Sequence, residues 1–319
     1  MRKVVLTASG GGHTGYAVAL AQRLVGKAEM FFLVPEGDTW TEAKVRGLGR
    51  VAWTKKARGP TDPLWKALPG LLMAGWQGLR AIPGDYEVFV SSGSNHSVPP
   101  ALAAKAKGLK LVNVESSVRF TRASLSALAL KPISDLTALQ WPEQEEILPG
   151  GLVVGPLYEL PAYEPRDEGY ILITGGTYGH KALFEVANEL DLDSVVLQTG
   201  RLDPGPYKVK HPGWVVFRFD PDFGRWLAGA SVVVSHLGKT VVDAALSYRK
   251  PVVIAPNPEW RHTAGWGDAE ILAEKLNAVL LEELSPEALM SAIGEAGGRR
   301  PPRYRDGARE LAKIILEEL

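Results

Sequence analysis

A histidine inside a glycine-rich turn is the first feature of this chain that could do chemistry. The stretch LTASGGGHTGYAVALAQRL places Gly10, Gly11 and Gly12 directly before His13, after an apolar run typical of a strand. Glycines let a backbone approach a ligand closely, and an imidazole accepts protons near neutral pH. His13 is therefore a candidate general base, and we expect the following helix to begin near Tyr16.

The same turn has a second interpretation as a dinucleotide fingerprint. Gly10, Gly12 and Gly15 spell G-x-G-x-x-G, which with Glu36 on a ribose would describe an NAD-dependent oxidoreductase. That function would leave a second phosphate-type loop, late in the chain, without a role.

Four loops rich in small residues follow strand-like runs. They are ASGGGHTG near the N-terminus, SSGSNHSVPP at 91–100, ITGGTYGH at 173–180, and the start of a stretch at 232–256 that contains SHLGKT. Loops at the carboxyl ends of parallel strands form the ligand sites of open α/β sheets. Four such loops favour a ligand cleft.

The order of the elements predicts an α/β fold with two domains. Apolar runs that alternate with helical segments indicate parallel sheets, and they occur at 3–8, 30–34, 86–91, 109–114, 170–174, 194–198, 214–217, 231–235 and 251–255. We expect two Rossmann-like domains facing a cleft, one over 1–155 and one over 169–319, joined by a linker over 156–168. The C-terminal helix could return to the first domain.

Composition excludes several classes of protein. The 319 residues include no cysteine, so disulfides and thiolate chemistry are absent, and the six histidines have no zinc-site spacing. No apolar run reaches the roughly 18 residues of a membrane span, and the N-terminus has no signal-peptide pattern. We therefore expect a cytoplasmic protein.

Positive charge is concentrated in residues 44–80. This segment carries eight basic residues and one acid, Asp62, and includes PLWKALPGLLMAGWQGLRAIP, whose Leu and Trp residues recur at helical spacing. Basic flanks with an apolar, tryptophan-containing stripe suit a membrane surface. The alternative is a core helix beside a solvated basic loop. Because no nucleic-acid motif accompanies the charge, we expect no nucleic-acid partner.

The late stretch FRFDPDFGRWLAGASVVVSHLGKTVVDAALSYRKPVVIAP resembles the donor-nucleotide region of GT-B glycosyltransferases that use UDP-GlcNAc. The stretches ASGGGHTGYAVALAQRL, SSGSNHSVPPALAAKAKGLKLVNVESSVR and LKPISDLTALQWPEQ look like the acceptor subunit of the two-subunit enzyme that adds the second GlcNAc to dolichyl-pyrophosphate-GlcNAc. The second half looks like the donor-binding subunit. The bacterial lipid II GlcNAc transferase is a more distant relative with the same two-domain plan.

The resemblance implies a UDP-GlcNAc site in the second half. A helix that starts after Ser-His-x-Gly would direct its free amides at the diphosphate, with Lys239 adding a charge unless it is a solvent lysine, and Asp243 would accept from the ribose. His262 stands where the family commonly has a His-Gln pair, but Thr263 follows it here. The implied contacts are Gly175, Gly176, Thr177, Phe219, Ser235, His236, Gly238, Lys239, Thr240, Asp243 and His262.

The resemblance also implies an acceptor site in the first half. The histidine of the turn is a candidate base for the attacking hydroxyl, and Glu115 either orients and charge-balances His13 or is the base itself; a helix-capping or ion-pairing role is its structural alternative. Arg119 and Arg122 would clamp a pyrophosphate if a helix follows, or else be surface charges. The implied acceptor contacts are Gly11, Gly12, Thr14, Gly15, Gly93, Ser94, Asn95, Ser116, Arg119 and Arg122.

The resulting hypothesis is an inverting transfer of GlcNAc from UDP-GlcNAc to a polyprenyl(dolichyl)-pyrophosphate-linked GlcNAc, by a peripheral enzyme at the cytoplasmic face of the membrane. The product would be a chitobiose-type disaccharide for N-glycan assembly. We expect no essential metal or other cofactor, because helix amides and Lys239 can carry the diphosphate charge. The alternatives are another UDP-sugar or lipid acceptor, and a non-catalytic module that binds UDP-sugars or recruits a partner.

Overall fold

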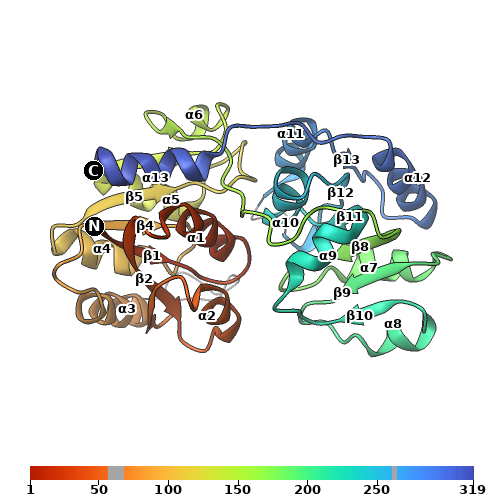
Figure 1. Cartoon of the computed structure of the whole chain (residues 1–319), viewed down its shortest axis with the longest axis horizontal. Coiled ribbons are helices and arrows are strands. Elements are labelled where there is room, and N and C mark those ends of the chain that lie inside the picture. The colour runs from red at the N-terminus through yellow and green to blue at the C-terminus, as the bar shows by residue number, and fades with distance from the viewer. Residues whose placement is uncertain (57–67, 261–263) are drawn as a thin grey trace. The chain divides into compact units, whose positions relative to one another are not determined.

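The protein consists of two compact units (Figure 1). The structure, a computed structural model, describes residues 1–56, 68–260 and 264–319. Unit 1 contains Met1–Glu159 together with Arg305–Leu319, and unit 2 contains Leu160–Tyr304. The first unit thus ends four residues later than the predicted boundary at 155, and the C-terminal helix belongs to it.

Unit 1 alternates strands and helices along the chain. Its elements are β1 (Arg2–Thr7), α1 (Gly11–Leu24), β2 (Ala28–Pro35), α2 (Thr39–Val45), β3 (Arg50–Thr54), α3 (Leu68–Ala81), β4 (Val88–Ser91), α4 (Val98–Ala106), β5 (Lys110–Val114), α5 (Leu125–Leu130), β6 (Leu136–Leu139), α6 (Gln144–Ile147), β7 (Leu152–Val153) and α13 (Gly307–Glu317). A short 3₁₀ turn, Lys131–Ile133, precedes β6.

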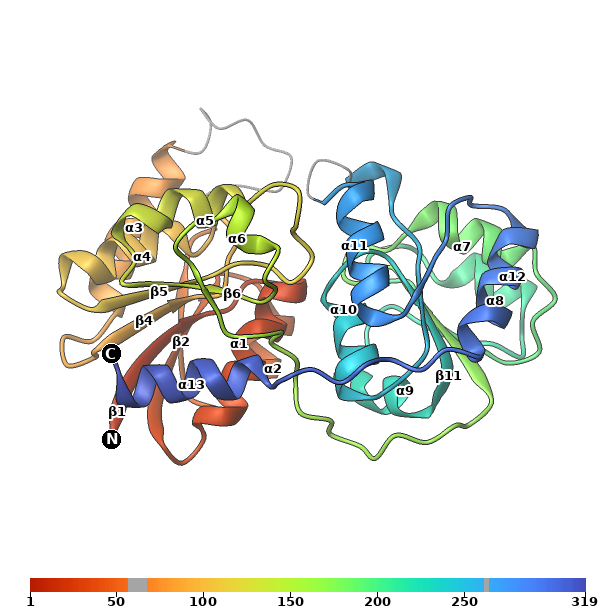
Figure 2. The same ribbon diagram turned by 90° about the horizontal axis from the view of Figure 1, so that it is seen from above.

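The sheet of unit 1 is parallel and has helices on both faces. Within the described residues its seven strands are ordered β3-β2-β1-β4-β5-β6-β7, and Leu6 of β1 pairs with Phe32 on one side and Val90 on the other. Alternate residues of a strand point to opposite faces. Val4 and Leu6 accordingly pack with α1 and α13, whereas Val5 packs with residues of α3, α4 and α5 (Figure 2).

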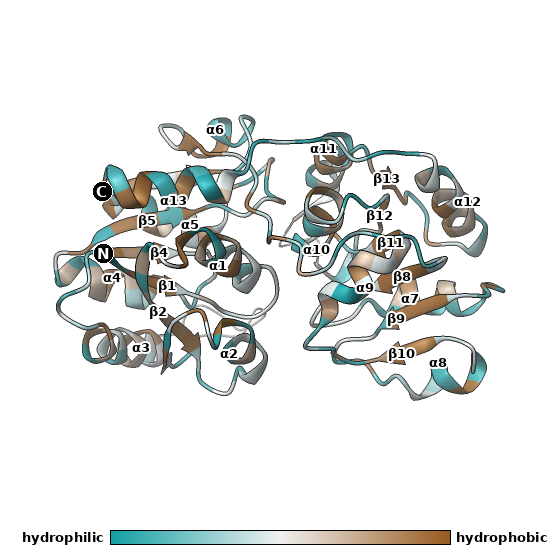
Figure 3. Ribbon diagram, viewed as in Figure 1, coloured by the Kyte–Doolittle hydropathy of each residue, from teal (hydrophilic) through white to brown (hydrophobic). Residues whose placement is uncertain are grey.

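Unit 2 repeats this plan with a six-stranded sheet, ordered β10-β9-β8-β11-β12-β13. Its elements are β8 (Tyr170–Thr174), α7 (Lys181–Asn188), β9 (Val195–Gln198), α8 (Gly205–Lys210), β10 (Val215–Phe217), α9 (Phe223–Gly229), β11 (Ala230–Ser235), α10 (Lys239–Val242), β12 (Val252–Ile254), α11 (Trp266–Leu276), β13 (Val279–Leu280) and α12 (Pro286–Gly297). A π-helical turn, Asp243–Ser247, follows α10, and a 3₁₀ turn spans Pro258–Trp260. The strands of both units are strongly apolar, whereas helices such as α8 and α13 alternate apolar and polar residues (Figure 3).

These observations confirm the predicted α/β class with two parallel, Rossmann-like sheets. One local prediction was wrong, because helix α1 begins at Gly11 rather than near Tyr16. The edge strand β3, within the basic run, was not predicted. The strands β6, β7 and β13 were also missed. In each sheet the strand order reverses at one point, between β1 and β4 and between β8 and β11, which is where ligands of open α/β sheets bind.

Across the described ranges, no helix has both the length and the apolar character that crossing a bilayer requires.

Candidate active site

The loop after β1 in unit 1 is a left-handed glycine turn that leads directly into α1. Gly10 and Gly11 have φ values of 57° and 53°, which residues with a Cβ disfavour. The amides at the start of α1, including that of Gly12, have no acceptor within the helix. A helix N-terminus of this kind attracts anions. The predicted acceptor contacts Gly11 and Gly12 therefore lie at an anion-attracting edge.

His13 lies in the first turn of α1 and is held by a main-chain carbonyl. Its Nδ1 is 2.9 Å from the oxygen of Ser92, in the loop after β4. Because a carbonyl only accepts, Nδ1 carries the hydrogen, and Nε2 of the neutral ring keeps its lone pair. Burial lowers the pKa of His13, and the charges of Lys56 and Arg119 lower it further, against the opposing effect of the Ser92 carbonyl. The imidazole is therefore neutral at pH 7 and able to accept a proton.

Gly93 packs directly against the His13 ring. Its φ of 87° is left-handed, and a Cβ built there would lie 2.9 Å from His13 Nδ1 and 3.0 Å from Cε1. Only glycine satisfies both requirements. The next residue, Ser94, has a left-handed φ of 73° and lies 2.6 Å from Ser9 through the two hydroxyls. Gly93, Ser94 and the half-buried Asn95 thus border the turn that carries His13.

Thr14 and Gly15 differ from the other predicted acceptor contacts. The Thr14 hydroxyl lies 2.9 Å from that of Thr41 and is almost fully buried. Gly15 is buried within α1. Both residues hold α1 in place, so the prediction that they contact the acceptor is not supported by their environment.

Glu115, after β5, anchors its own loop. The side chain is fully buried, and its two oxygens accept from the amides of Ser116 at 2.6 Å and Ser124 at 2.8 Å. Burial raises the pKa of the Glu115 carboxyl, although these donors oppose the effect. The Ser92 carbonyl, rather than Glu115, orients the His13 ring, and the alternative that Glu115 is itself the base stays a prediction. The two bonds hold the loop between β5 and α5 and are neither a helix cap nor an ion pair.

The predicted arginine clamp rested on a helix that does not form. Residues 116–124 are turns and bends, so Arg119 and Arg122 are not one helical turn apart. The charge of Arg119 lowers the pKa of both His13 and Glu115. Arg119 therefore lies near the glycine-histidine turn, whereas Arg122 is exposed.

In unit 2, the loops after β8 and β11 meet at the point where the strand order reverses. A Cβ on Gly176, whose φ is 65°, would lie 2.7 Å from Cε1 of His236. Gly238 approaches the same ring, 2.8 Å from its Nε2. The loops that carry Gly175, Gly176, Thr177, Ser235, His236 and Gly238 are therefore adjacent, as predicted from their positions after strands.

Two buried polar atoms at the end of β11, Ser235 Oγ and His236 Nδ1, have no hydrogen-bond partner within the described parts of the chain. Burial, with a smaller contribution from His180, lowers the pKa of His236 to about 4. A neutral imidazole and a hydroxyl can both donate to phosphate oxygens. The cluster has the donors that a diphosphate requires.

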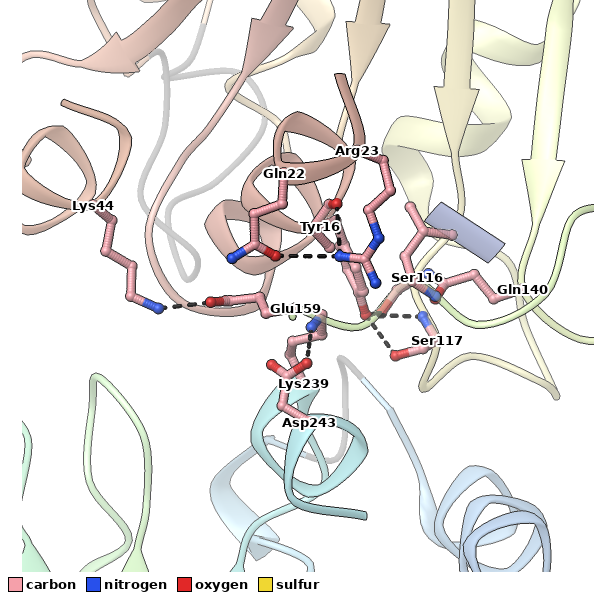
Figure 4. A network of polar contacts seen from close by, with 12 residues as sticks. Tyr16, Gln22, Arg23, Lys44, Ser116, Ser117, Gln140, Glu159, Lys239 and Asp243 are labelled. Carbon is pink, nitrogen blue, oxygen red and sulfur yellow. Dashed lines mark hydrogen bonds and ion pairs between the residues drawn. The ribbon is translucent and has the colours of Figure 1, made fainter. Parts of the chain in front are cut away.

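Lys239 and Asp243 form an ion pair on one face of the helical segment after Gly238 (Figure 4). Their side chains are only 5% and 10% exposed. The alternative of a solvent lysine is therefore wrong. The two residues predicted to contact diphosphate and ribose are bonded to each other, and their ligand contacts stay a prediction. The π-helical turn begins at Asp243. Thr240, in α10, is half-buried.

The other predicted donor contacts lie in loops. Phe219 follows β10 by two residues and is 38% exposed. His262 lies outside the described residues.

Asp220 accepts from the Asp222 amide at 2.9 Å and from Trp226 Nε1 at 2.7 Å, so its carboxylate already has hydrogen-bond donors within the protein. Within the described residues, no group of three or more metal-binding side chains is present.

Sequence reasoning missed two residues of these clusters. His180 caps α7, with Nδ1 accepting from the Leu183 amide at 3.3 Å, and its position directly before a helix was the available signal. Tyr16 lies one turn after His13, and their rings are 6.3 Å apart. The i, i+3 spacing was the available signal there.

Comparison with known proteins identifies unit 2. Residues 170–300 match the glycosyltransferase family 28 C-terminal domain. Unit 2 thus contains a glycosyltransferase domain. A transferase from Solibacter usitatus, named for UDP-N-acetylglucosamine and N-acetylmuramyl-(pentapeptide) pyrophosphoryl-undecaprenol, is 24% identical over 97% of this chain and 93% of its own. The enzyme of the same name from Syntrophotalea carbinolica is 25% identical over 94% and 91%.

Solved structures establish the GT-B fold. MurG of Acinetobacter baumannii matches with a TM-score of 0.63 at 18% identity, covering 99% of both chains. CalG4, the calicheamicin glycosyltransferase, matches with a TM-score of 0.60 at 16% identity, covering 99% of this chain and 93% of its own. A putative UDP-N-acetylglucosamine 2-epimerase from Listeria monocytogenes reaches 0.70 at 14% identity, covering 99% and 97%. Because transferases and epimerases share this fold, the fold alone does not define the reaction.

Proposed function

We propose that the chain transfers GlcNAc from UDP-GlcNAc to a sugar carried on a polyprenyl pyrophosphate. The observation that carries this proposal is the likeness, over 91–97% of the chain, to transferases named for UDP-GlcNAc and a pyrophosphoryl-undecaprenol acceptor. The glycosyltransferase domain in unit 2 supports it independently of those names.

Unit 1 supplies the base in the proposed reaction. An acceptor hydroxyl gives its proton to Nε2 of His13 as its oxygen bonds to C1 of GlcNAc, and the C1–O bond to UDP breaks with its electron pair leaving on the β-phosphate. The configuration at C1 is inverted by this single displacement. The Nδ1–H bond to Ser92 supports the role, because it fixes the tautomer and aims the ring.

Unit 2 binds UDP-GlcNAc in the proposed reaction. The unpartnered Ser235 hydroxyl and the neutral His236 ring are the proposed diphosphate donors, supported by Gly238 and Lys239 at the start of the helical segment.

We further propose that no metal is needed, because preorganised donors can stabilise a leaving diphosphate. Activity that survives EDTA supports this part, and activity lost to EDTA and restored by Mg²⁺ or Mn²⁺ overturns it.

The acceptor sugar is the finer part of the proposal. The first-half motifs favour a polyprenyl-pyrophosphate-GlcNAc acceptor and a chitobiose-type product for N-glycan assembly. The named relatives favour an N-acetylmuramyl-pentapeptide lipid instead. We propose the GlcNAc acceptor and retain the muramyl acceptor as the second candidate.

A membrane-surface contact accompanies this function in the proposal. Leu72, Met73, Trp76 and Leu79 on α3 are all exposed, with Leu72 at 68% and Trp76 at 50%. The inner side of α3 is small: Ala74 is buried, and Gly78 lies against α4. This arrangement supports the membrane-surface interpretation for the described part, 68–80, while Leu64 and Trp65 lie outside the described residues. Apolar side chains beside basic residues favour a peripheral position on an anionic, cytoplasmic membrane face.

The test is a transfer assay with purified protein, labelled UDP-GlcNAc and two short-chain lipids, one bearing pyrophosphate-GlcNAc and one bearing pyrophosphate-N-acetylmuramyl-pentapeptide. A labelled disaccharide on the first lipid supports the proposal. Product on the second lipid alone replaces the acceptor assignment with the muramyl candidate. Absence of lipid product from both, with turnover of another nucleotide sugar, overturns the donor assignment.

A further inference from the structure

Thr7, the last residue of β1, is bonded to the loop that holds His13. The Thr7 hydroxyl accepts from the Ser92 amide at 3.2 Å, and the Ser92 hydroxyl donates to the Thr7 carbonyl at 2.6 Å. The register of β1 with β4 extends only to Leu6 and Val90, so these two bonds continue the contact beyond the paired part of the strands. Thr7 therefore bonds directly to the residue whose carbonyl accepts from His13 Nδ1.

Ser97, directly before α4, holds the next residue of the same loop. Its hydroxyl donates to the Gly93 carbonyl, and its oxygen lies 3.0 Å from Thr7 Oγ1. A serine before a helix usually accepts from the amide of the second or third helical residue. Here those residues are Pro99 and Pro100, which have no amide hydrogen. The two prolines therefore leave the Ser97 hydroxyl to the loop.

The hydrogens of the two hydroxyls can be placed by counting. A carbonyl only accepts, so the one hydroxyl hydrogen of Ser97 goes to Gly93, and Ser97 can only accept from Thr7. Thr7 accepts from the Ser92 amide and has Ser97 as its nearest acceptor, ahead of the Val90 carbonyl at 3.3 Å. A directed chain thus runs from the Ser92 amide through both hydroxyls to the Gly93 carbonyl. Successive bonds in such a chain polarise and strengthen one another.

This chain is buried and encloses the group that orients His13. Thr7 and Ser97 are fully buried, and Ser92 is nearly so. Loss of either hydroxyl would leave a buried main-chain group without its partner, which is costly. The chain fixes the backbone on both sides of the Ser92 carbonyl, and that carbonyl determines the tautomer and the direction of the ring.

We propose that Thr7 and Ser97 are positioning residues for the general base. Their hydroxyls hold the Ser92 carbonyl in place, and the carbonyl keeps His13 with its hydrogen on Nδ1 and a lone pair on Nε2. The inference rests on the proposed function for the catalytic role of His13. Because both hydroxyls are fully buried, they act through the loop and not on a substrate.

Nitrogen NMR of protein labelled at its histidines tests the positioning without catalysis. The two ring nitrogens report which of them carries the hydrogen, and His13→Gln identifies the His13 signals. The wild type should show His13 with the hydrogen on Nδ1. Thr7→Val, which has a similar shape but no hydroxyl, should populate the Nε2–H tautomer as well. Thr7→Ser keeps the hydroxyl and should show the wild-type signals.

The transfer assay gives the kinetic counterpart. Thr7→Val should lower kcat about tenfold, the value of leaving one buried group unpaired, and Thr7→Ser should restore kcat to within about twofold of wild type. Thr7→Val with Ser97→Ala should lose less than the product of the two single losses, because both changes break one chain. KM for UDP-GlcNAc should be unchanged in each variant.

Thr137→Val is the matched control. Thr137 is a buried threonine of the same sheet, on β6, so this variant makes the same chemical change away from the loop. Its kcat and its His13 signals should match those of the wild type. A loss equal to that of Thr7→Val would trace the effect to general destabilisation and overturn the inference.

Other outcomes would also overturn the inference. They are a wild-type His13 tautomer or a wild-type kcat in Thr7→Val, and a Thr7→Ser variant that behaves like Thr7→Val. Ser97→Ala tests the same chain if Thr7→Val folds poorly, and an unchanged kcat in that variant would count equally against it. If the tautomer changes as expected but the wild type forms no disaccharide, the proposed function fails and the positioning of the His13 ring stands.

Discussion

Gly93→Ala is the substitution whose effect can be worked out most directly from the structure. The left-handed φ of 87° strains any residue with a Cβ, at a cost of about 1–2 kcal/mol in stability. The new methyl would also lie 2.9 Å from His13 Nδ1, so the ring must move by several tenths of an ångström. That movement weakens the bond to Ser92, which contributes about 0.5–1.5 kcal/mol.

A matched control separates the two effects. Gly150, also in unit 1, has a φ of 81° with nothing within 4 Å of a built Cβ. Gly150→Ala therefore carries the backbone strain without displacing a side chain. The backbone strain should lower the thermal unfolding temperature of both variants by a similar amount. Gly93→Ala should lose additional stability, because it also displaces the His13 ring.

The transfer assay should separate the variants more strongly. A general base contributes about 10²–10⁴-fold to a rate, and a displaced base loses much of that. We expect kcat of Gly93→Ala to fall about 100-fold and that of Gly150→Ala to stay within about twofold of wild type. Equal kcat values for the two variants would refute the idea that the position of His13 limits the reaction.

Three further predictions concern the pH profile, the buried ion pair and the membrane surface. The folded pKa of His13 lies below its ordinary value of 6.5, so kcat/KM should be flat at neutral pH and fall only as pH drops below 6.5. His13→Gln should remove this acidic fall in kcat/KM and lower kcat about 10²–10⁴-fold. If the acidic fall survives in His13→Gln, the base is another group. Asp243→Asn leaves the Lys239 ammonium buried and should lower the free energy of unfolding in urea by about 3–5 kcal/mol. The double variant Lys239→Met with Asp243→Leu should lower it by less. If the losses from the two single changes simply add in the double variant, Lys239 and Asp243 are not coupled. The double variant Leu72→Ser with Trp76→Ser should reduce the fraction of protein that sediments with anionic phosphatidylglycerol vesicles, while kcat on a water-soluble acceptor is kept. Unchanged sedimentation would exclude α3 from the membrane contact.

The two-sheet fold could be predicted from the sequence because its strands are buried on both faces and appear as continuous apolar runs. The missed strands explain the limits of that signal. Arg50–Thr54 is an edge strand with an exposed Trp53 and charged neighbours, so its composition was indistinguishable from a basic loop. Val279–Leu280 is too short to form a pattern. The start of α1 was misplaced because glycine disfavours helices, although the first turn tolerates it.

The positions of the site loops could also be predicted, but their bonding could not. His13 and Gly93 follow neighbouring strands, which sequence position indicates. The hydrogen bond from His13 is made to a main-chain carbonyl 79 residues away. Because every residue has such a carbonyl, the side-chain types in the sequence do not indicate this contact. The pairing of Lys239 with Asp243 was accessible from their i, i+4 spacing, but the family resemblance directed both residues to the ligand instead.

Mass spectrometry of the lipid product tests the central claim most directly. After incubation of the purified chain with UDP-GlcNAc and short-chain polyprenyl-pyrophosphate-GlcNAc, the account predicts a lipid heavier by one N-acetylhexosamine. Release of UDP with a free or epimerised sugar and no change in the lipid would contradict it.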